Sequence, residues 1–380
     1  MSDARLPNMN LPNLGNELLW RIFAKTDPKT AVRCRVLNKV WWARLMTPLF
    51  AKHNFKENKE KNMHLIVGLG RPPSHENSGL LLRVDMDTRI QHEGTVPEDI
   101  SHYGNFQIIG SSHGIIYLKF YMGSVDSGIA IWNPLTRKKE SATDESRKHI
   151  THAVSLYAFG HIFDNLDFAI VHVFKKYFHQ TALNWCLYSN TARNWDCTGT
   201  FESSVQKLGP TNVVHRGVVY WIGWEGVAVP RPKYVITFNL RTKAFAEKDI
   251  PQSAKRMYHT LSCVKDFVVL ISTDTLGFKN AINIFQVTCY DKPDFTFERM
   301  FRMPTMALPY TPAMFAGKFL ITAVEARSGQ YCGNDAERTD LLISKHNCEA
   351  LTSEHLLHRI WREIMCLKSI TPHSHGFYKV

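Results

Sequence analysis

One strand–turn–strand unit recurs along the middle of the chain and restricts the folds open to it. Its four copies begin at Ile131, Leu187, Phe238 and Phe285, so successive starts lie 56, 51 and 47 residues apart. The first three copies carry a polar turn with a basic residue between two runs, and the fourth is degenerate. A four-stranded propeller blade needs about 40–50 residues. The spacing therefore predicts a β-propeller, and generic β-hairpins at coincidental spacing are the alternative.

Short β-branched and aromatic runs, separated by Gly, Asn, Pro and Asp, fill the chain from residue 63 to residue 351. This pattern is typical of a mainly antiparallel β domain. The predicted strands are 64–69, 80–84, 106–110, 115–120, 129–132, 168–174, 182–188, 213–221, 234–239, 267–271, 282–288 and 319–324. Gly114 and Gly217 are expected at turns into strands. The aromatic residues Trp132, Tyr220 and Trp221 are expected to pack between sheets.

Residues 11–55 follow a helical pattern instead. A first helix is predicted over 17–25, where Leu18 and Ile22 stand four residues apart, with Asn16 as its cap. Asp27-Pro28 predicts the start of a second helical run, because an acidic cap is followed by proline at the first helical position. Pro48 is expected to limit any further helix. Leu11, Leu18, Ile22, Leu37 and Trp41 are more apolar residues than so small a bundle can bury, so we expect some to face a partner. An ordinary helical cap on a larger domain is the alternative.

The two ends of the β domain are predicted from composition. Residues 56–62 form a charged linker, KENKEKN. In the tail 352–380, Thr352 or Ser353 can cap a C-terminal helix that reaches about residue 367, with Pro372 beyond it. Its apolar stripe would be Leu356, Leu357, Ile360, Trp361, Ile364 and Met365. We expect this helix to dock on the β domain, and a partner groove is the alternative.

The net charge of +12 raises the question of nucleic acid, so its distribution matters. Residues 29–44 hold five basic residues and no acidic one. On a helix, Lys29 and Arg33 share a face, as do Arg35 and Lys39. Such a face can follow phosphates, meet an acidic protein surface, or simply be solvated. The charge alone leaves these three interpretations open.

Little in the chain indicates catalysis or membrane insertion. There is no phosphate loop, no Gly-x-Ser-x-Gly elbow and no His-Glu-x-x-His motif. The eight cysteines are dispersed without a C-x-x-C pair, and the close histidine pairs lack a third ligand. We therefore expect no cofactor and no metal. No apolar run approaches eighteen residues, which predicts a soluble protein of the cytoplasm, the nucleus or both.

The segment 11–55 resembles an F-box, the adaptor-binding module of Skp–cullin–F-box ubiquitin ligases, in the form found in plants. Leu11-Pro12 matches the opening of the motif. The first helix matches through Leu18, Leu19, Ile22 and Phe23, and the later basic and apolar pattern matches through Lys29, Arg33, Leu37, Lys39 and Trp41. The chain departs from the motif at Thr26-Asp27 and at Cys34.

The β region is similar to plant F-box-associated domains. The residues that carry this resemblance are Ser111-Ser-His-Gly-Ile-Ile-Tyr, Ile131-Trp-Asn-Pro-Leu-Thr, Tyr157-Ala-Phe-Gly-His, His215-Arg-Gly-Val-Val-Tyr-Trp and Ile236-Thr-Phe-Asn-Leu. The two resemblances imply a small all-α F-box followed by a mainly antiparallel β domain of irregular propeller type.

What the resemblance implies about function is a non-catalytic receptor subunit. An acidic Skp-type adaptor would bind Leu11, Pro12, Leu18, Ile22, Leu37 and Trp41, and the adaptor would in turn bind a cullin. The β domain would hold an unknown target protein. A basic nucleic-acid-binding protein and a propeller enzyme or lectin with a helical cap are the rival hypotheses. An F-box protein that holds its adaptor without promoting ubiquitination is a third.

Overall fold

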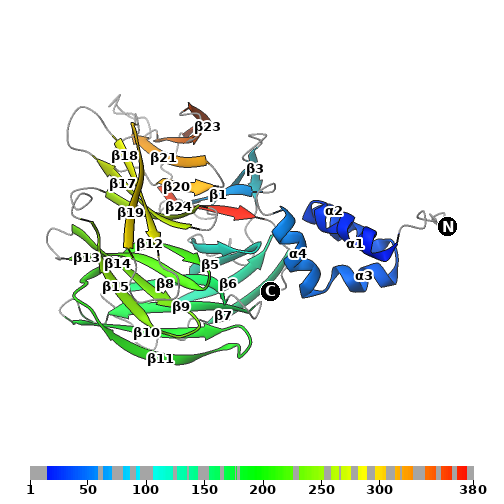
Figure 1. Ribbon diagram of the computed structural model, residues 1–380, viewed down its shortest axis with the longest axis horizontal. Helices are drawn as coiled ribbons and strands as arrows, with labels where there is room; N and C mark the ends of the chain where they lie inside the picture. The colour runs from blue at the N-terminus through cyan, green and yellow to red at the C-terminus, as the bar shows by residue number, and fades with distance from the viewer. Residues whose placement is uncertain are drawn as a thin grey trace.

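Four helices and six β-sheets make up the part of the chain that the computed structural model describes. The described residues are 15–58, 63–70, 80–85, 91–94, 106–122, 126–134, 137–143, 154–162, 167–175, 177, 180–225, 231–251, 258–264, 267–274, 281–288, 296–304, 313–316, 319–327, 339–347, 352–361 and 366–374. Figure 1 shows the helices gathered at one side of the sheets.

The helices begin where side chains or prolines favour a start. They are α1 (Asn16–Lys25), α2 (Pro28–Arg33), a 3₁₀ turn η1 (Cys34–Val36), α3 (Lys39–Leu45) and α4 (Pro48–Asn58). Asp27 Oδ1 accepts a hydrogen bond from the backbone N–H of Thr30 at 3.0 Å, which confirms the predicted cap. The predicted cap at Asn16 is wrong, because Gly15 precedes α1 and makes no side-chain bond. Pro48 starts a further helix, since proline is well suited to a first turn.

The predicted linker 56–62 needs correction at its start, because α4 continues to Asn58. Two asparagines explain why this helix extends so far. Asn54 Nδ2 donates to the carbonyls of Phe23, Ala24 and Thr26 at 3.2, 3.0 and 2.9 Å. Asn58 Nδ2 donates to Ala24 and Thr26 at 2.9 and 3.1 Å. These buried amides bind carbonyls at the end of α1, where a helix leaves its last carbonyls without the usual backbone partners.

Every sheet has four antiparallel strands. The strands of the first three sheets in chain order are β1 (Met63–Gly70), β2 (Leu80–Asp85) and β3 (Gln91–Gly94); β4 (Phe106–Ser112), β5 (Ile115–Met122), β6 (Asp126–Asn133) and β7 (Lys138–Thr143); and β8 (Val154–Ile162), β9 (Asp167–Lys175), β10 (Ala182–Ser189) and β11 (Asn194–Glu202). The next two are β12 (Lys207–His215), β13 (Val218–Glu225), β14 (Arg231–Asn239) and β15 (Phe245–Asp249); and β16 (Tyr258–Val264), β17 (Phe267–Asp274), β18 (Ala281–Thr288) and β19 (Thr296–Pro304). The last is β20 (Ala313–Ala316), β21 (Phe319–Arg327), β22 (Thr339–Asn347) and β23 (Thr352–Trp361), while β24 (Cys366–Ser374) returns to join β1.

This order makes a six-bladed β-propeller closed by its two ends. Blade 1 has the order β24-β1-β2-β3, and blades 2 to 6 are the consecutive meanders β4–β7 to β20–β23. The first strand of each meander lies innermost, next to the first strand of the neighbouring blade, and β24 takes this inner place in blade 1. β24 pairs with β1 from Met63↔Ser374 to Gly70↔Cys366. The last strand of the chain therefore completes the first blade (Figure 1).

The sequence repeat coincides with the blades. Ile131, Leu187, Phe238 and Phe285 all lie in the third strand of a blade, namely β6, β10, β14 and β18. The spacing thus arises from blades, which confirms the propeller prediction. The turns at Gly114 and Gly217 are also confirmed, with φ of 81° and 75° that glycine adopts without steric cost.

Apolar side chains fill the space between neighbouring blades from blade 2 to blade 5. Ile115 and Tyr117 pack against blade 3, whereas Ile116 and Leu118 of the same strand lie in a cluster on the other face. Trp221 is fully buried between blades 3 and 4, and Tyr220 between blades 4 and 5. The predicted packing between sheets is therefore confirmed for Trp221 and Tyr220. Trp132 is buried in a cluster of blade 2 side chains, so its packing between sheets stays a prediction. A Cβ atom on Gly160 would overlap Val214, which shows how closely the inner strands of blades 3 and 4 approach.

Two predictions about strands and helices are wrong. Residues 213–221 are the hairpin β12–β13, with its turn at Arg216-Gly217, and not one strand. The predicted C-terminal helix is replaced by β23 and β24, so sheet structure continues beyond residue 351. The adjacent apolar residues Leu356 and Leu357 resemble a helical stripe because they interrupt strand alternation. In the structure a β-bulge lies there, since His355 pairs with Ser344 and Leu357 with Ile343.

A buried histidine joins blades 2 and 3 near their inner strands. His161 of β8 shares a hydrogen bond of 3.0 Å between its Nδ1 and Ser112 Oγ, and its ring centroid lies 4.1 Å from that of His113. Burial, and secondarily the nearby His113, holds the pKa of His161 well below its usual value. His161 is therefore neutral in the folded protein at neutral pH.

Acidification should destabilise the propeller through His161. The unfolded chain takes up a proton near pH 6.5, about the usual histidine pKa, whereas the folded chain does so only at lower pH. The free energy of unfolding should therefore fall as pH is lowered through about 6.5. Urea unfolding at a series of pH values measures this. In His161→Gln the decrease should be smaller, and an unchanged pH dependence in that variant would contradict the assignment.

Candidate functional site

The helices expose an unusual number of large apolar side chains. On α1, Leu18 and Ile22 are 48% and 42% exposed and stand one turn apart. On η1 and the start of α3, Val36, Leu37 and Val40 are 88%, 42% and 58% exposed. We call these five residues the apolar ridge. So many large apolar side chains exposed on one small helical module make it a candidate interaction surface.

The structure divides the predicted site residues into two classes. Leu18, Ile22 and Leu37 lie at the surface as predicted, whereas Trp41 is 3% exposed and belongs to the core of the helical module. Its ring packs edge-on against Phe23 with centroids 4.9 Å apart. The pattern alone could not separate these roles, because α3 begins anew at Lys39 and turns Trp41 inward. Leu11 and Pro12 lie outside the described residues.

Sequence reasoning missed part of the exposed apolar surface. Trp42 of α3 is 55% exposed, Met46 directly after α3 is 40% exposed, and Leu49 of α4 is 68% exposed. Trp42 and Met46 are four residues apart in the sequence, so their spacing was a signal that could have identified them. The core of the module is nevertheless well formed. It contains Leu19, Phe23, Ala24, Ala31, Trp41, Leu45, Phe50 and Ala51.

Charges around the apolar ridge are mostly basic. Arg35 is partly buried, and this burial lowers its pKa, which still leaves a guanidinium charged at neutral pH. The Cζ atom of Arg44 lies over the Trp41 ring, 5.3 Å from its centroid, where the guanidinium makes a favourable cation–π interaction. Cys34 is a free, partly buried thiol. Its burial raises the thiol pKa, and the Asp27 carboxylate acts in the same direction, so the thiolate is disfavoured.

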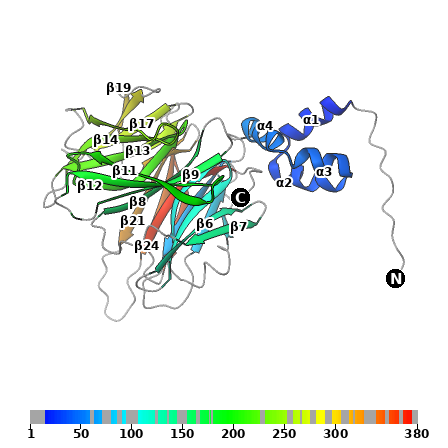
Figure 2. The same cartoon turned by 90° about the horizontal axis from the view of Figure 1, so that it is seen from below.

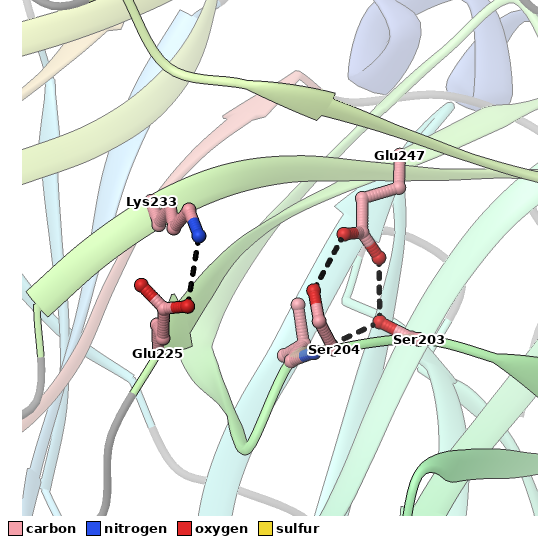
Figure 3. Close-up of polar contacts among 6 residues, drawn as sticks. Ser203, Ser204, Glu225, Lys233 and Glu247 are labelled. Atoms are coloured by element: carbon pink, nitrogen blue, oxygen red, sulfur yellow. Dashed lines mark hydrogen bonds and ion pairs between the residues drawn. The ribbon is translucent and has the colours of Figure 1, made fainter.

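The polar contacts of the propeller tie its strands together. Ser203 and Ser204, between β11 and β12, donate to Glu247 of β15 at 2.6 and 3.1 Å (Figure 3). Lys233 Nζ donates to Glu225 Oε1 at 2.8 Å across β13 and β14 (Figure 3). This contact raises the pKa of Lys233 above its usual value. Neither group brings a histidine or a cysteine to the serines, so the chemistry is that of structural hydrogen bonds.

Other classes of site were sought in the part of the chain that the structure describes. Within it, no three histidine, cysteine or acidic side chains converge as metal ligands. Among the helices described, none is both long and apolar enough to cross a bilayer. The apolar ridge therefore remains the strongest candidate for a functional surface.

Comparison with protein families connects this architecture to a known group. The model of the F-box associated beta propeller domain matches residues 83–360, which is well over half of the chain and extends from blade 1 into β23. An Arabidopsis thaliana F-box protein is 27% identical over 230 residues, or 59% of this chain and 52% of the relative. The chain thus spans about half the length of this curated relative.

Solved structures of similar shape are more distant. A Bacteroides uniformis protein described as a candidate 6-phosphogluconolactonase has a TM-score of 0.43 and 11% identity, over 82% of this chain and 99% of that one. A Lactobacillus plantarum protein has a TM-score of 0.42 and 8% identity, over 82% of this chain and 98% of that one. Likenesses at this level carry no argument about activity. The family match decides, and the chain belongs to the plant F-box proteins that carry an F-box-associated β-propeller domain.

Proposed function

We propose that this chain is the substrate-recognition subunit of a Skp–cullin–F-box ubiquitin ligase. Its helices would bind a Skp-type adaptor, and through it a cullin, while the propeller holds a target protein for ubiquitination. The single observation that carries the proposal is the exposure of Leu18, Ile22 and Leu37 at the positions of the F-box pattern. The basic charge of the surrounding helices favours an acidic adaptor.

Catalysis in this proposal is a matter of proximity. The chain itself would make and break no bond. Holding a target near a ubiquitin-conjugating enzyme in the same assembly raises the effective concentration of the target lysine, often to the millimolar range (about 1 mM for short flexible tethers). A protein that does this in the cytoplasm or the nucleus needs neither a cofactor nor a metal.

The adaptor should be lost when the apolar ridge becomes charged. In Leu18→Asp/Ile22→Asp, two half-exposed side chains would carry charge into the contact, so adaptor affinity should fall by about a hundredfold or more. The free energy of unfolding should change little, since neither residue belongs to the core. Calorimetric titration with a purified Skp-type adaptor measures the affinity.

Tyr177→Asp supplies the control for this pair. Tyr177 is 50% exposed between β9 and β10 of the propeller, outside the helical module, and the variant should bind the adaptor like the original protein. Undiminished binding by the Leu18/Ile22 variant would overturn the proposal. If the original protein binds the adaptor but a reconstituted ligase containing it transfers no ubiquitin, the chain is a receptor that holds its adaptor without promoting modification.

Trp41→Ala should act differently, through the fold. Because Trp41 is buried against Phe23, its truncation should cost about 3–5 kcal/mol of stability. Chemical denaturation should show the helical module unfolding at a lower denaturant concentration. Adaptor binding should weaken only to the extent that the module is unfolded, which separates this residue from Leu18 and Ile22.

A further inference from the structure

Apart from the glycines, the described residues that adopt left-handed backbone conformations are of one chemical kind. Among the described residues, five non-glycine residues have positive φ. They are His113, Arg137, Arg193, Arg216 and Lys243, with φ between 50° and 60°. Arginine and lysine have no local hydrogen bond that favours this conformation, and glycine would adopt it without steric cost. Residues held in such conformations tend to lie at functional sites.

The five residues all lie on one face of the propeller. His113 and Arg216 are in turns between the first and second strands of blades 2 and 4. Arg137, Arg193 and Lys243 are in turns between the third and fourth strands of blades 2, 3 and 4. In an antiparallel meander these two kinds of turn lie at the same end of the strands. We call this end of the propeller the turn face.

The outer turns of blades 3 and 4 share one construction. The backbone N–H of Arg193 donates to the carbonyl of Ser189 at 2.7 Å, and that of Lys243 donates to Asn239 at 2.8 Å. Asn239 Oδ1 accepts from the N–H groups of Arg241 and Thr242 at 2.9 and 3.0 Å, which holds the turn in shape. These two turns therefore present Arg193 and Lys243 on a defined backbone.

Positive charge predominates on the turn face and not on the opposite one. Arg137, Arg193, Arg216 and Lys243 are all exposed. Arg193 has an acidic neighbour, since its Nε lies 3.7 Å from Glu140 Oε1 of the adjacent blade. At the other ends of the strands, acidic and basic residues are mixed: Glu202, Glu225, Glu247 and Asp249 accompany Lys207, Lys233 and Lys248. The field of the turn face therefore favours a negatively charged partner.

The helical module is attached on the same side. Met63 starts β1 opposite Ser374 at the end of β24, and this end of the inner strand is the turn face. Only four residues separate Asn58 of α4 from Met63 in the sequence, a reach of roughly 18 Å at most. Figures 1 and 2 show α4 beside this end of the propeller. A partner on the turn face would thus lie on the same side as the apolar ridge.

We propose that the turn face binds an acidic segment of the target protein. The inference rests on the proposed receptor function and adds the chemistry of the target to it. The basic residues are divided among turns of blades 2, 3 and 4, and the acidic residues Glu140 and Asp167 lie at the same ends of the strands. This mixed pattern suits carboxylates spaced along a polypeptide better than a continuous row of phosphates. The described residues of these turns also include no Phe, Tyr or Trp on which nucleic-acid bases could stack.

The test compares two triple variants of the full chain that lose the same charge. Arg137→Gly/Arg193→Gly/Lys243→Gly removes three positive charges from the turn face and keeps its backbone, because glycine accepts positive φ. Lys207→Gln/Lys233→Gln/Lys248→Gln removes three from the opposite face. A fluorescein-labelled peptide of alternating Glu and Ser is the probe, and its fluorescence anisotropy is measured at physiological ionic strength. Affinity should fall about tenfold in the first variant and remain unchanged in the second.

Each other outcome overturns the proposal. Equal losses of affinity in both variants would indicate attraction by net charge alone. If the original protein does not bind the peptide, the turn face is not a site for acidic segments. Tighter binding of a labelled single-stranded RNA, lost in the same glycine variant, would make the face a nucleic-acid surface. Adaptor titration on the same proteins tests the receptor function separately, since none of the six substitutions lies in the apolar ridge.

Discussion

Pairing between the two ends of the described chain, β1 and β24, is the interaction on which the rest of the structure depends. Without β24, blade 1 would lack its inner strand. The inner strand of blade 2, β4, would then lose its neighbour in the ring. The same pairing fixes where the chain enters the propeller, because Met63 lies opposite Ser374. Closure of the ring thus determines both the number of blades and the side on which the helices are attached.

Two surfaces with different physics follow from this arrangement. The apolar ridge on α1, η1 and α3 suits burial against a partner, and its energy would come from the area removed from water. The turn face offers separated, exposed charges, whose individual contributions are small and weaken with salt. In the proposed complex, a tightly held adaptor and a more weakly held target lie on one side of the propeller. Such a division suits a receptor that must release its product.

The sequence predicted the features that depend on local patterns and missed those that depend on distant pairing. The repeat at Ile131, Leu187 and Phe238 follows the spacing of the blades, so it predicted the propeller. Outer strands such as Lys138–Thr143 are polar and carry no apolar run, so only their pairing with an inner neighbour reveals them. The strand β24 was not predicted, since its partner β1 lies about 300 residues earlier in the chain. The predicted helix fell mainly on β23, where the bulge at Leu356 interrupts strand alternation. The F-box pattern listed Leu18, Ile22 and Trp41 together and could not show that Trp41 alone is buried, because α3 begins anew at Lys39.

The position of the helices relative to the turn face is the central structural claim, and chemical cross-linking of the intact protein tests it most directly. An amine-reactive cross-linker followed by mass spectrometry should join Lys52 or Lys56 of α4 to Lys138 or Lys139, at the start of β7 on the turn face. Cross-links from α4 to Lys207, Lys233 or Lys248, at the opposite ends of the strands, would contradict the account.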